Sequence, residues 1–333
     1  MRAWQVTQLG EPSQVLAATE IPEPEPGPGQ IRVSVAAAAC NFADVLLCRG
    51  EYQVKPDLPF TPGVELCGVV DQVGTGVPSE LLHGRVVGQP TLPHGGFAES
   101  ALLEAHSAFT VPDNLDDVRA AALHLTYLTP WLGLHHRARL QPGEVLVVTG
   151  AAGGVGTATI QLGLAAGAQV IGIVSDARKA EAARELGATH VIDRSETDAI
   201  SAVKELTDGR GADVVFESVG GEAYRQATKY VAFEGRILLV GFASGTIPQQ
   251  RLDHVFVKNY SLLGLHWAPY LNRHPELVRN AQEELFDLAS ANQIAPLVRT
   301  AHMDELPHAL EELGDRRVLG KTVLTYRPAS AQH

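Results

Sequence analysis

A glycine-rich turn near the middle of the chain resembles a phosphate-binding turn, although the first of its glycines, Gly150, lies one residue early. Gly150, Gly153 and Gly156 follow a short apolar run at 145–148 and precede a stretch rich in Ala, Leu and Gly. Gly153 lets the backbone approach a pyrophosphate, and Gly156 lets a helix pack closely on the preceding strand. The free N–H groups at the helix start then hold the phosphate charge. This pattern predicts a dinucleotide-binding turn.

The turn departs from the strict G-x-G-x-x-G fingerprint, because Ala151 stands where the first glycine is expected. A strand before it, a helix after it and a second strand about 20 residues further on are the context that the motif requires. The alternative is a glycine-rich turn without a ligand. The expected cofactor contacts in the turn are Ala151, Gly153, Gly154, Val155 and Gly156.

The residues after the second strand bear on which dinucleotide is bound. Enzymes that prefer NAD place a carboxylate here, which binds the ribose 2′-hydroxyl and repels a 2′-phosphate. This position falls on Ser175, with Arg178 and Lys179 on the next turn and Arg194 after the third strand. Such cations suit a phosphate and favour NADPH. Two alternatives stay open: Asp176, one residue away, would favour NADH, and the Arg–Lys pair is also typical of a solvated helix face.

A parallel sheet is needed to position these residues. From about residue 116 onward, stretches with strand character alternate with helical stretches. The expected strands lie at 145–149, 169–174, 190–192, 213–217, 236–241 and 260–265, and the expected helices include 177–186, 197–207 and 221–230. Strands alternating with helices of about 10–15 residues predict a doubly wound parallel sheet, an α/β fold. Later helices are expected at 275–289 and 303–313, and a last strand at 321–326.

Residues 1–110 have a different character, with frequent Gly and Pro between short β-rich runs. These runs lie at 3–7, 30–36, 64–73, 85–87 and 96–102. They predict an all-β lobe, a partly open barrel. One helix is expected in it, at 41–49, ended by Gly50. Prolines alternate with acidic residues or glycine at 21–29, which predicts an exposed linker.

Composition excludes several classes of function. The chain has 333 residues, enough for two domains. Its 26 Lys and Arg against 38 Asp and Glu give a net charge of −12 without a basic run, so we expect no nucleic-acid partner. Three cysteines without a C-x-x-C pair favour a reducing compartment. With no apolar stretch near ~20 residues and no secretory h-region, we expect a soluble, cytoplasmic protein that does not bind membranes.

Seven segments, taken together and in order, resemble the zinc-free quinone oxidoreductase branch of the medium-chain dehydrogenase/reductase superfamily, the zeta-crystallin-like proteins. They are AAACNFADVLLCRGEY (37–52), PFTPGVELCGVV (59–70), GGFAE (95–99), LTYLTPWLGL (125–134), TGAAGGVGTATIQLGLAAGAQVIG (149–172), ELGATHVID (185–193) and GKTVL (320–324). The resemblance implies a GroES-like lobe, residues 1–122 and 266–333, with a Rossmann domain, residues 123–265, between its two parts. It also implies NADPH as hydride donor and a homodimer formed through the edges of the Rossmann sheets.

The same resemblance argues against a catalytic zinc ion. Zinc-dependent relatives place a cysteine, the histidine of a G-H-E string and a further cysteine or carboxylate around the nicotinamide. The first two positions here hold Asn41 and Val64, the latter followed by Glu65, and neither supplies the N or S atoms that zinc takes. Cys40 lies one position away and is expected to be a small buried residue. We expect no metal, and a zinc-type alcohol dehydrogenase is the alternative.

Without a metal, the electrophile must disperse the incoming charge itself, as a quinone or an α,β-unsaturated carbonyl does. Hydrogen-bond donors near the reacting oxygen can then assist. Asn41 is the first candidate donor, because it matches a metal-ligand position of the family, although it also suits an N-cap of the 41–49 helix. Tyr52 is the second candidate, or else a packing residue. Asp44 is expected to fix the helix and the neighbouring loop.

Aromatic residues are expected to line the substrate cleft, although such side chains are also ordinary core residues. They are Tyr127, Trp131, Phe242 and Trp267. The expected cofactor contacts further include Val219, Gly241 and Phe242. The function predicted is an NADPH-dependent reductase of quinones or enones, with enoyl thioesters as a further class. A non-catalytic NADPH-binding protein is the alternative from another class.

Overall fold

The structure is a computed structural model that describes residues 1–326. The chain forms two compact units. Within the described residues, unit 1 comprises Met1–Leu125, Gln282–Ser290 and 298–326. Unit 2 comprises Thr126–Ala281 and Ala291–Leu297.

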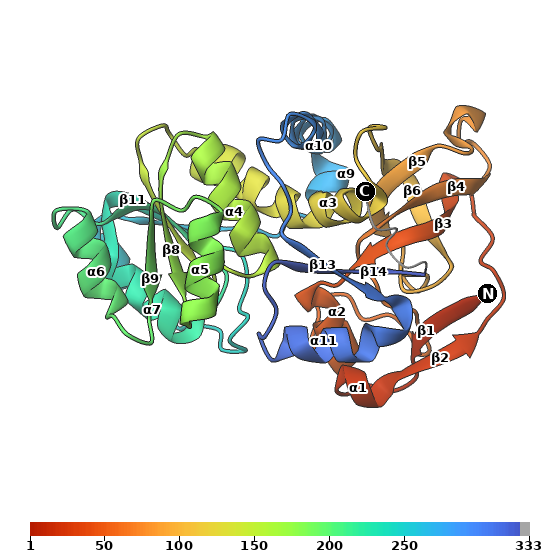
Figure 1. Ribbon diagram of the computed structural model, residues 1–333, viewed down its shortest axis with the longest axis horizontal. Helices are drawn as coiled ribbons and strands as arrows, with labels where there is room; N and C mark the ends of the chain where they lie inside the picture. Colours follow the sequence, from red (N-terminus) through yellow and green to blue (C-terminus); the bar gives the residue numbers. More distant parts are fainter. Residues whose placement is uncertain (327–333) are drawn as a thin grey trace. The chain divides into compact units, whose positions relative to one another are not determined.

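Unit 1 is built around a small barrel. Its antiparallel strands are β3 (Gln30–Ala39), β4 (Leu66–Val73), β5 (Arg85–Pro90) and β6 (Ser100–Thr110), and β6 pairs back with β3 to close the ring. Strand β14 (Lys321–Thr325) joins β3 on its other side, followed by β13 (Val298–His302). The predicted β-lobe, with the last strand of the chain added to it, is confirmed (Figure 1).

Short elements complete unit 1. Strands β1 (Arg2–Val6) and β2 (Leu16–Glu20) form a separate antiparallel pair. The helices are α1 (Pro12–Val15), α2 (Phe42–Arg49), α11 (Leu306–Gly314) and the 3₁₀ turns η1 (Ser79–Leu81) and η3 (Met303–Glu305). Helix α11 packs against α1 and α2, so helices from early and late parts of the described chain lie side by side (Figure 1). The expected linker at 21–29 contains neither helix nor strand.

Unit 2 contains the predicted parallel sheet. Its strands are β7 (Val145–Thr149), β8 (Gln169–Val174), β9 (His190–Asp193), β10 (Ala212–Glu217), β11 (Val231–Leu239) and β12 (Ser261–Gly264), in the order β12-β11-β10-β7-β8-β9. Helices α4 (Gly154–Ala165) and α5 (Ala177–Glu185) lie on one side of the sheet, and α6 (Ala199–Leu206) and α7 (Gly221–Tyr230) on the other (Figure 1). This is a doubly wound Rossmann sheet.

The strand order reverses direction between β7 and β10, which are neighbours in the sheet although β8 and β9 separate them in the chain. In open α/β sheets, ligands bind outside the carboxyl ends of the strands at such a switch point. The turns that follow β7 and β10 therefore define the candidate cofactor site of unit 2.

The remaining helices are α3 (Asp117–Trp131), the π-helical segment η2 (Leu132–Ala138), α8 (Leu252–Lys258), α9 (Tyr270–Arg273) and α10 (Pro275–Ser290). Helices α3 and α10 each contribute residues to both units. The sequence pattern did not predict α3 or α8 as elements.

The two compact units are divided differently from the predicted domains. Residues 266–281 and 291–297 belong to unit 2, whereas the sequence placed them in the GroES-like lobe. Contacts within unit 2 hold these two segments in it. Gln161 of α4 donates to the carbonyl of Ala295 over 3.0 Å and accepts from its N–H over 2.6 Å. The ring of Tyr270 also lies edge-on to that of His136, with centroids 5.7 Å apart. The predicted stretch 327–333 lies outside the described residues.

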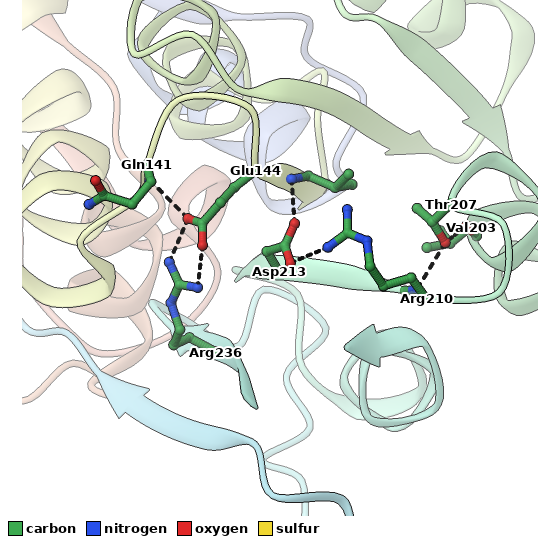
Figure 2. Close-up of polar contacts among 9 residues, drawn as sticks. Gln141, Glu144, Val203, Thr207, Arg210, Asp213 and Arg236 are labelled. Atoms are coloured by element: carbon green, nitrogen blue, oxygen red, sulfur yellow. Dashed lines mark hydrogen bonds and ion pairs between the residues drawn. The ribbon is translucent and has the colours of Figure 1, made fainter. Parts of the chain in front are cut away.

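An ion-pair network fixes the other ends of the strands in unit 2 (Figure 2). The guanidinium of Arg236 in β11 donates twice to the carboxylate of Glu144, over 2.8 and 2.7 Å, just before β7 begins. Asp213 of β10 accepts from the N–H of Val145 over 2.8 Å and pairs with Arg210. Burial alone would raise the pKa of Glu144, but the hydrogen bonds from Arg236 and from the N–H of Gln141, with the nearby arginine charges, together lower that pKa. The network holds β7, β10 and β11 together opposite the glycine turn.

Candidate active site and cofactor site

Asn41 immediately precedes helix α2 and is tied to its first turn. Its backbone N–H donates to Oδ2 of Asp44 over 2.8 Å, and the N–H of Asp44 donates to the carbonyl of Asn41 over 2.9 Å. Oδ1 of Asp44 accepts from the N–H groups of Gly63 and Val64, over 3.0 and 3.1 Å. Burial raises the pKa of Asp44 to about 7, against the lowering effect of these N–H groups and of Lys321. Asp44 therefore fixes Asn41 to the 63–64 turn.

The side-chain amide of Asn41 is enclosed by three partners. Its Nδ2 donates to the carbonyl of Ala39 over 3.1 Å and to Oε2 of Glu65 over 2.9 Å, and its Oδ1 accepts from Nζ of Lys321. Because an amide nitrogen has only two hydrogens, both are engaged inside the protein. Asn41 can donate to a substrate oxygen, as the sequence predicted, only if one of these bonds opens.

Lys321 and Glu65 close this arrangement into a triangle with Asn41. Nζ of Lys321 lies 3.1 Å from Oε2 of Glu65, and the two side chains are 7% and 0% exposed. Removing one partner of such a buried pair leaves an uncompensated charge, which is strongly destabilising. Sequence reasoning gave neither residue a place in the site. The available signals were Glu65, directly after the Val64 position, and the lysine of the GKTVL string.

Tyr52 lies against the apolar core of unit 1 and is half-buried. Burial, and then the charge of Asp44, raise the pKa of its phenol. The phenol therefore keeps its proton throughout the neutral range and can donate a hydrogen bond.

The glycine turn connects β7 to α4 as the sequence predicted. Gly150 has a φ of 62°, a left-handed conformation that favours glycine. A Cβ on Gly156 would lie 2.2 Å from the carbonyl oxygen of Gly150, so only glycine allows the helix to come this close. A Cβ on Gly153 would meet no atom nearer than 3.6 Å, and no side chain caps the start of α4. The backbone N–H groups of the first helical turn, including those of Gly154 and Val155, are therefore suited to an anionic ligand.

The departure at Ala151 has a local explanation. Its N–H donates to the carbonyl of Ile173 over 3.2 Å, which ties the turn to β8. A Cβ on Gly172 would lie only 3.1 Å from the Cβ of Ala151, so the methyl group fits because residue 172 has no side chain. The turn thus keeps its shape with alanine in place of the first glycine.

The turn after β10 is bonded to the glycine turn across the switch point. The N–H of Ser218 donates to Oγ1 of Thr149 and its Oγ donates to the carbonyl of Thr149, each over 3.2 Å. Oε1 of Glu217 accepts from the N–H groups of Val219 and Gly220, each over 2.7 Å. Its Oε2 is buried and has no hydrogen-bond partner among residues 1–326, and burial raises the pKa of this carboxyl. Glu217 therefore shapes the turn from inside the fold.

The predicted contacts Val219, Gly241 and Phe242 are brought together at this place. The N–H of Ser244 donates to the carbonyl of Val219 over 2.8 Å. A Cβ on Gly220 would lie 3.1 Å from the ring of Phe242, so this ring packs on the turn itself.

After β8, Ser175, Asp176 and Lys179 form a compact polar cluster. Asp176 caps α5 by accepting from the N–H of Lys179 over 2.9 Å, and it also accepts from Oγ of Ser175 over 2.9 Å. Nζ of Lys179 donates to Oγ of Ser175 over 2.9 Å and lies 3.4 Å from the carboxylate. These bonds, the backbone N–H of Lys179 first, lower the pKa of Asp176. The carboxylate is thus paired with the lysine that was predicted to meet a 2′-phosphate.

Two arginines, Arg194 and Arg178, were also predicted to meet the 2′-phosphate, and their backbones are placed differently. The N–H of Arg194 donates to the carbonyl of Val174 over 3.1 Å, which places this residue beside the carboxyl end of β8. Arg178 lies on α5, and both arginines are exposed.

The predicted pocket residues all belong to unit 2. Tyr127, Trp131 and Trp267 are buried, and Phe242 is 37% exposed. The ring of Trp131 packs on that of His135, with centroids 5.2 Å apart. Burial raises the pKa of the Tyr127 phenol.

Within residues 1–326, no group of three or more His, Cys, Asp or Glu could hold a metal ion. Cys40, Cys48 and Cys67 are free and buried, and burial raises the pKa of each thiol. None of the helices in this part of the chain has the length and apolar character to cross a membrane.

Comparison with known proteins gives consistent matches to both units. Residues 27–113 match the family described as alcohol dehydrogenase GroES-like domain, and residues 154–283 match the family described as zinc-binding dehydrogenase. The chain is 39% identical over 287 residues to a quinone oxidoreductase-like protein 2 homolog of Nematostella vectensis, a match that covers 85% of this chain and 78% of the relative.

Two solved structures are similar over nearly their whole length. A quinone oxidoreductase of Pseudomonas syringae pv. Tomato DC3000 has a TM-score of 0.91 and 31% identity, with 97% of this chain and 99% of that chain covered. The Escherichia coli quinone oxidoreductase complexed with NADPH has a TM-score of 0.91 and 29% identity, with 98% and 100% covered.

Proposed function

The chain belongs to the quinone oxidoreductase branch of the medium-chain dehydrogenase/reductase superfamily, and from this membership we propose that it reduces quinones or α,β-unsaturated carbonyl compounds with NADPH. It is an oxidoreductase of this family. The observation that supports this substrate class is that Asn41, which matches a metal-ligand position of the zinc-dependent relatives, is bonded to Glu65 and Lys321 instead.

The residues of unit 2 fit NADPH. The uncapped start of α4, the space beside Gly153 and the close approach at Gly156 suit a pyrophosphate. Ser175, Lys179 and Arg194 at the end of β8 suit the 2′-phosphate. The Escherichia coli relative was solved with NADPH, which supports the same cofactor here. When bound, NADPH supplies the hydride.

The residues of unit 1 do not fit zinc. Asn41 and Val64 replace two ligands, and the Asn41 side chain is already bonded to Lys321 and Glu65. The ammonium ion of Lys321 sits 3.1 Å from Glu65, so a second cation at that carboxylate would be repelled. No step of the proposed reaction therefore runs through a metal, although the family that residues 154–283 match is described as zinc-binding dehydrogenase.

Without a Lewis acid, the substrate must accept hydride with little help, which a conjugated carbonyl does by delocalising the negative charge. Asn41 and Tyr52 are the proposed hydrogen-bond donors to the resulting oxyanion. Nδ2 of Asn41 donates two hydrogen bonds, and the one to the carbonyl of Ala39, at 3.1 Å, is longer than the one to Glu65. This longer bond is the one that we propose is replaced by a bond to the substrate oxygen. The aromatic residues Tyr127, Trp131, Phe242 and Trp267 are the proposed apolar walls for a flat substrate.

We also propose a homodimer formed through the edge of the unit 2 sheet. Strand β12 is an edge strand, and an uncovered edge is a template for pairing with another strand. Large apolar side chains in the segment that precedes β12 in the sequence are exposed: Ile247 by 72%, Leu252 by 76%, Phe256 by 80% and Val257 by 73%. An apolar surface of this kind is typical of a protein interface.

The test is to measure NADPH oxidation by absorbance with a panel of quinones, enones and enoyl thioesters as acceptors. The same assays are run with NADH in place of NADPH. Turnover of one of these classes with NADPH is the expected result. Zinc-dependent oxidation of simple alcohols would favour the alcohol dehydrogenase alternative. No turnover of any acceptor by protein that binds NADPH would leave the non-catalytic alternative.

A further inference from the structure

Lys321 is a charged residue in the interior of unit 1. Its side chain is 7% exposed, and its Nζ donates to Oδ1 of Asn41 and lies 3.1 Å from Oε2 of Glu65. Burying an ammonium ion is costly unless it is paired and hydrogen-bonded. Asn41 and Glu65 therefore stabilise the buried charge of Lys321, and Lys321 in turn restrains their side chains.

The backbone places Lys321 at this point independently of its side chain. Strand β14, which begins with Lys321, pairs with β3, the strand that leads to Asn41. The N–H of Cys40 donates to the carbonyl of Thr322 over 2.9 Å. The ammonium ion thus stands on a rigid strand directly beside Asn41, and not on a mobile loop.

The chemistry of the two partners allows the Asn41 amide only one orientation. A lysine ammonium has donors alone, and an ionised carboxylate has acceptors alone. Oδ1 of Asn41 must therefore face Lys321, and Nδ2 must face Glu65. Turning the amide over would bring its NH₂ against the ammonium ion and its oxygen against the carboxylate.

We propose that Lys321 is a positioning residue, which holds the Asn41 amide so that its NH₂, and not its carbonyl oxygen, is presented as the donor in the reaction. The proposal rests on the proposed function, in which Asn41 assists hydride transfer. The competing explanation is that Lys321 only neutralises Glu65 and contributes stability.

Three variants separate these explanations: Lys321→Met, Glu65→Gln and the double variant. We expect Lys321→Met to lower the melting temperature and to lower kcat by about 10- to 100-fold, with KM for NADPH within about twofold, because the Asn41 donor is misplaced. In the double variant neither partner of the Lys321–Glu65 pair leaves an unpaired charge, although Asp44 still loses the nearby ammonium ion, so the melting temperature should return part of the way to the wild-type value. Its kcat should stay low, because the bond to Oδ1 of Asn41 is still missing.

The matched control is Arg236→Met, which breaks the half-buried ion pair with Glu144 in unit 2. It should lower the melting temperature and leave kcat unchanged. The proposal is overturned if kcat recovers together with the melting temperature in the double variant, or if folded Lys321→Met keeps the wild-type kcat. Should the single variant fail to fold, the comparison of the double variant with Glu65→Gln carries the test.

Crystal structures separate this proposal from the proposed function. If none of the acceptors supports NADPH oxidation by the wild-type protein, the proposed function fails. The positioning role of Lys321 is then tested by the conformation of the Asn41 side chain in crystals of the wild-type protein and of Lys321→Met. A changed side-chain rotamer or a changed set of neighbouring polar groups at Asn41 in the Lys321→Met crystal supports the positioning role. An Asn41 side chain with the same rotamer and the same neighbours, apart from residue 321, overturns it.

Discussion

The side-chain amide of Asn41 donates to the carboxylate of Glu65 over 2.9 Å, at a place where these two residues are 6% and 0% exposed. Asn41 is thus part of an internal network as well as the proposed donor to substrate. We predict that Asn41→Ala lowers kcat by on the order of 10²-fold, the loss typical of a preorganised donor. The dissociation constant of NADPH should change little.

The same variant should lower the free energy of unfolding by about 1–3 kcal/mol, because Glu65 and Lys321 each lose a buried partner. Steady-state kinetics and urea unfolding measure the two effects separately. Loss of stability with unaltered kcat would show that Asn41 only begins α2 and completes the network.

We predict that purified protein contains no stoichiometric zinc and that chelators do not change its activity. The reason is that Asn41 and Val64 stand in the ligand positions and Lys321 is paired with Glu65. Elemental analysis and a chelator titration check this prediction. Activity that is lost on chelation and restored by zinc would overturn it.

The cluster after β8 predicts the response of cofactor preference to mutation. Lys179→Ala and Arg194→Ala should each raise KM for NADPH by an amount equivalent to about 1.5–3 kcal/mol, the value of a lost charged hydrogen bond, and leave KM for NADH nearly unchanged. Asp176→Asn keeps an oxygen to cap α5 but removes the charge beside Lys179, so KM for NADPH should not rise.

Kinetics with both cofactors decide this assignment. Efficient use of NADH by the wild-type enzyme, or equal weakening of both cofactors in the alanine variants, would contradict it. A rise of KM for NADH in Asp176→Asn would instead identify Asp176 as the residue that binds the ribose.

The lowered pKa of Glu144 predicts a specific acid dependence of stability. Its ionised form is favoured in the folded state by Arg236, so its contribution is present above the unfolded-state pKa of about 4.3 and is lost as the pH falls through the lower, folded-state value. Glu144→Gln should cost about 1–3 kcal/mol at neutral pH and should remove this part of the acid dependence.

Urea unfolding at stepwise lower pH measures this contribution to the free energy of unfolding, in the wild-type protein and in Glu144→Gln. The matched control is Glu222→Gln, which breaks an exposed pair with Arg225 on α7 and should change stability by less than about 1 kcal/mol. An equal effect of the two substitutions would mean that the Arg236 pair is no stronger than a surface pair.

The proposed dimer predicts that a charge on α8 separates the subunits. Phe256 is 80% exposed, and Phe256→Glu should shift the wild-type dimer to a monomer in light scattering coupled to size exclusion. Leu9→Glu is the matched control, since Leu9 is 55% exposed and belongs to unit 1. A wild-type protein that is monomeric at all concentrations would refute the interface.

The sequence by itself determined the parallel sheet and the cofactor turn. The strands expected at 145–149 and 169–174 are β7 and β8 within the same bounds, and the glycine spacing identified the turn between them. These features are local: a buried strand, a tight turn and a helix start each have a pattern over a few consecutive residues. For the same reason the cap formed by Asn41 and Asp44 could be anticipated.

The tertiary structure alone decided which side chains surround Asn41. Lys321 is separated from it by 280 residues in the chain, and it arrives there because β14 pairs with β3. The hydrogen bond between Gln161 and Ala295 likewise joins residues of unit 2 that are 134 residues apart in the chain. Periodicity and propensity describe neighbours in sequence, whereas a buried ion pair depends on the register of strands that the chain brings together only when it folds.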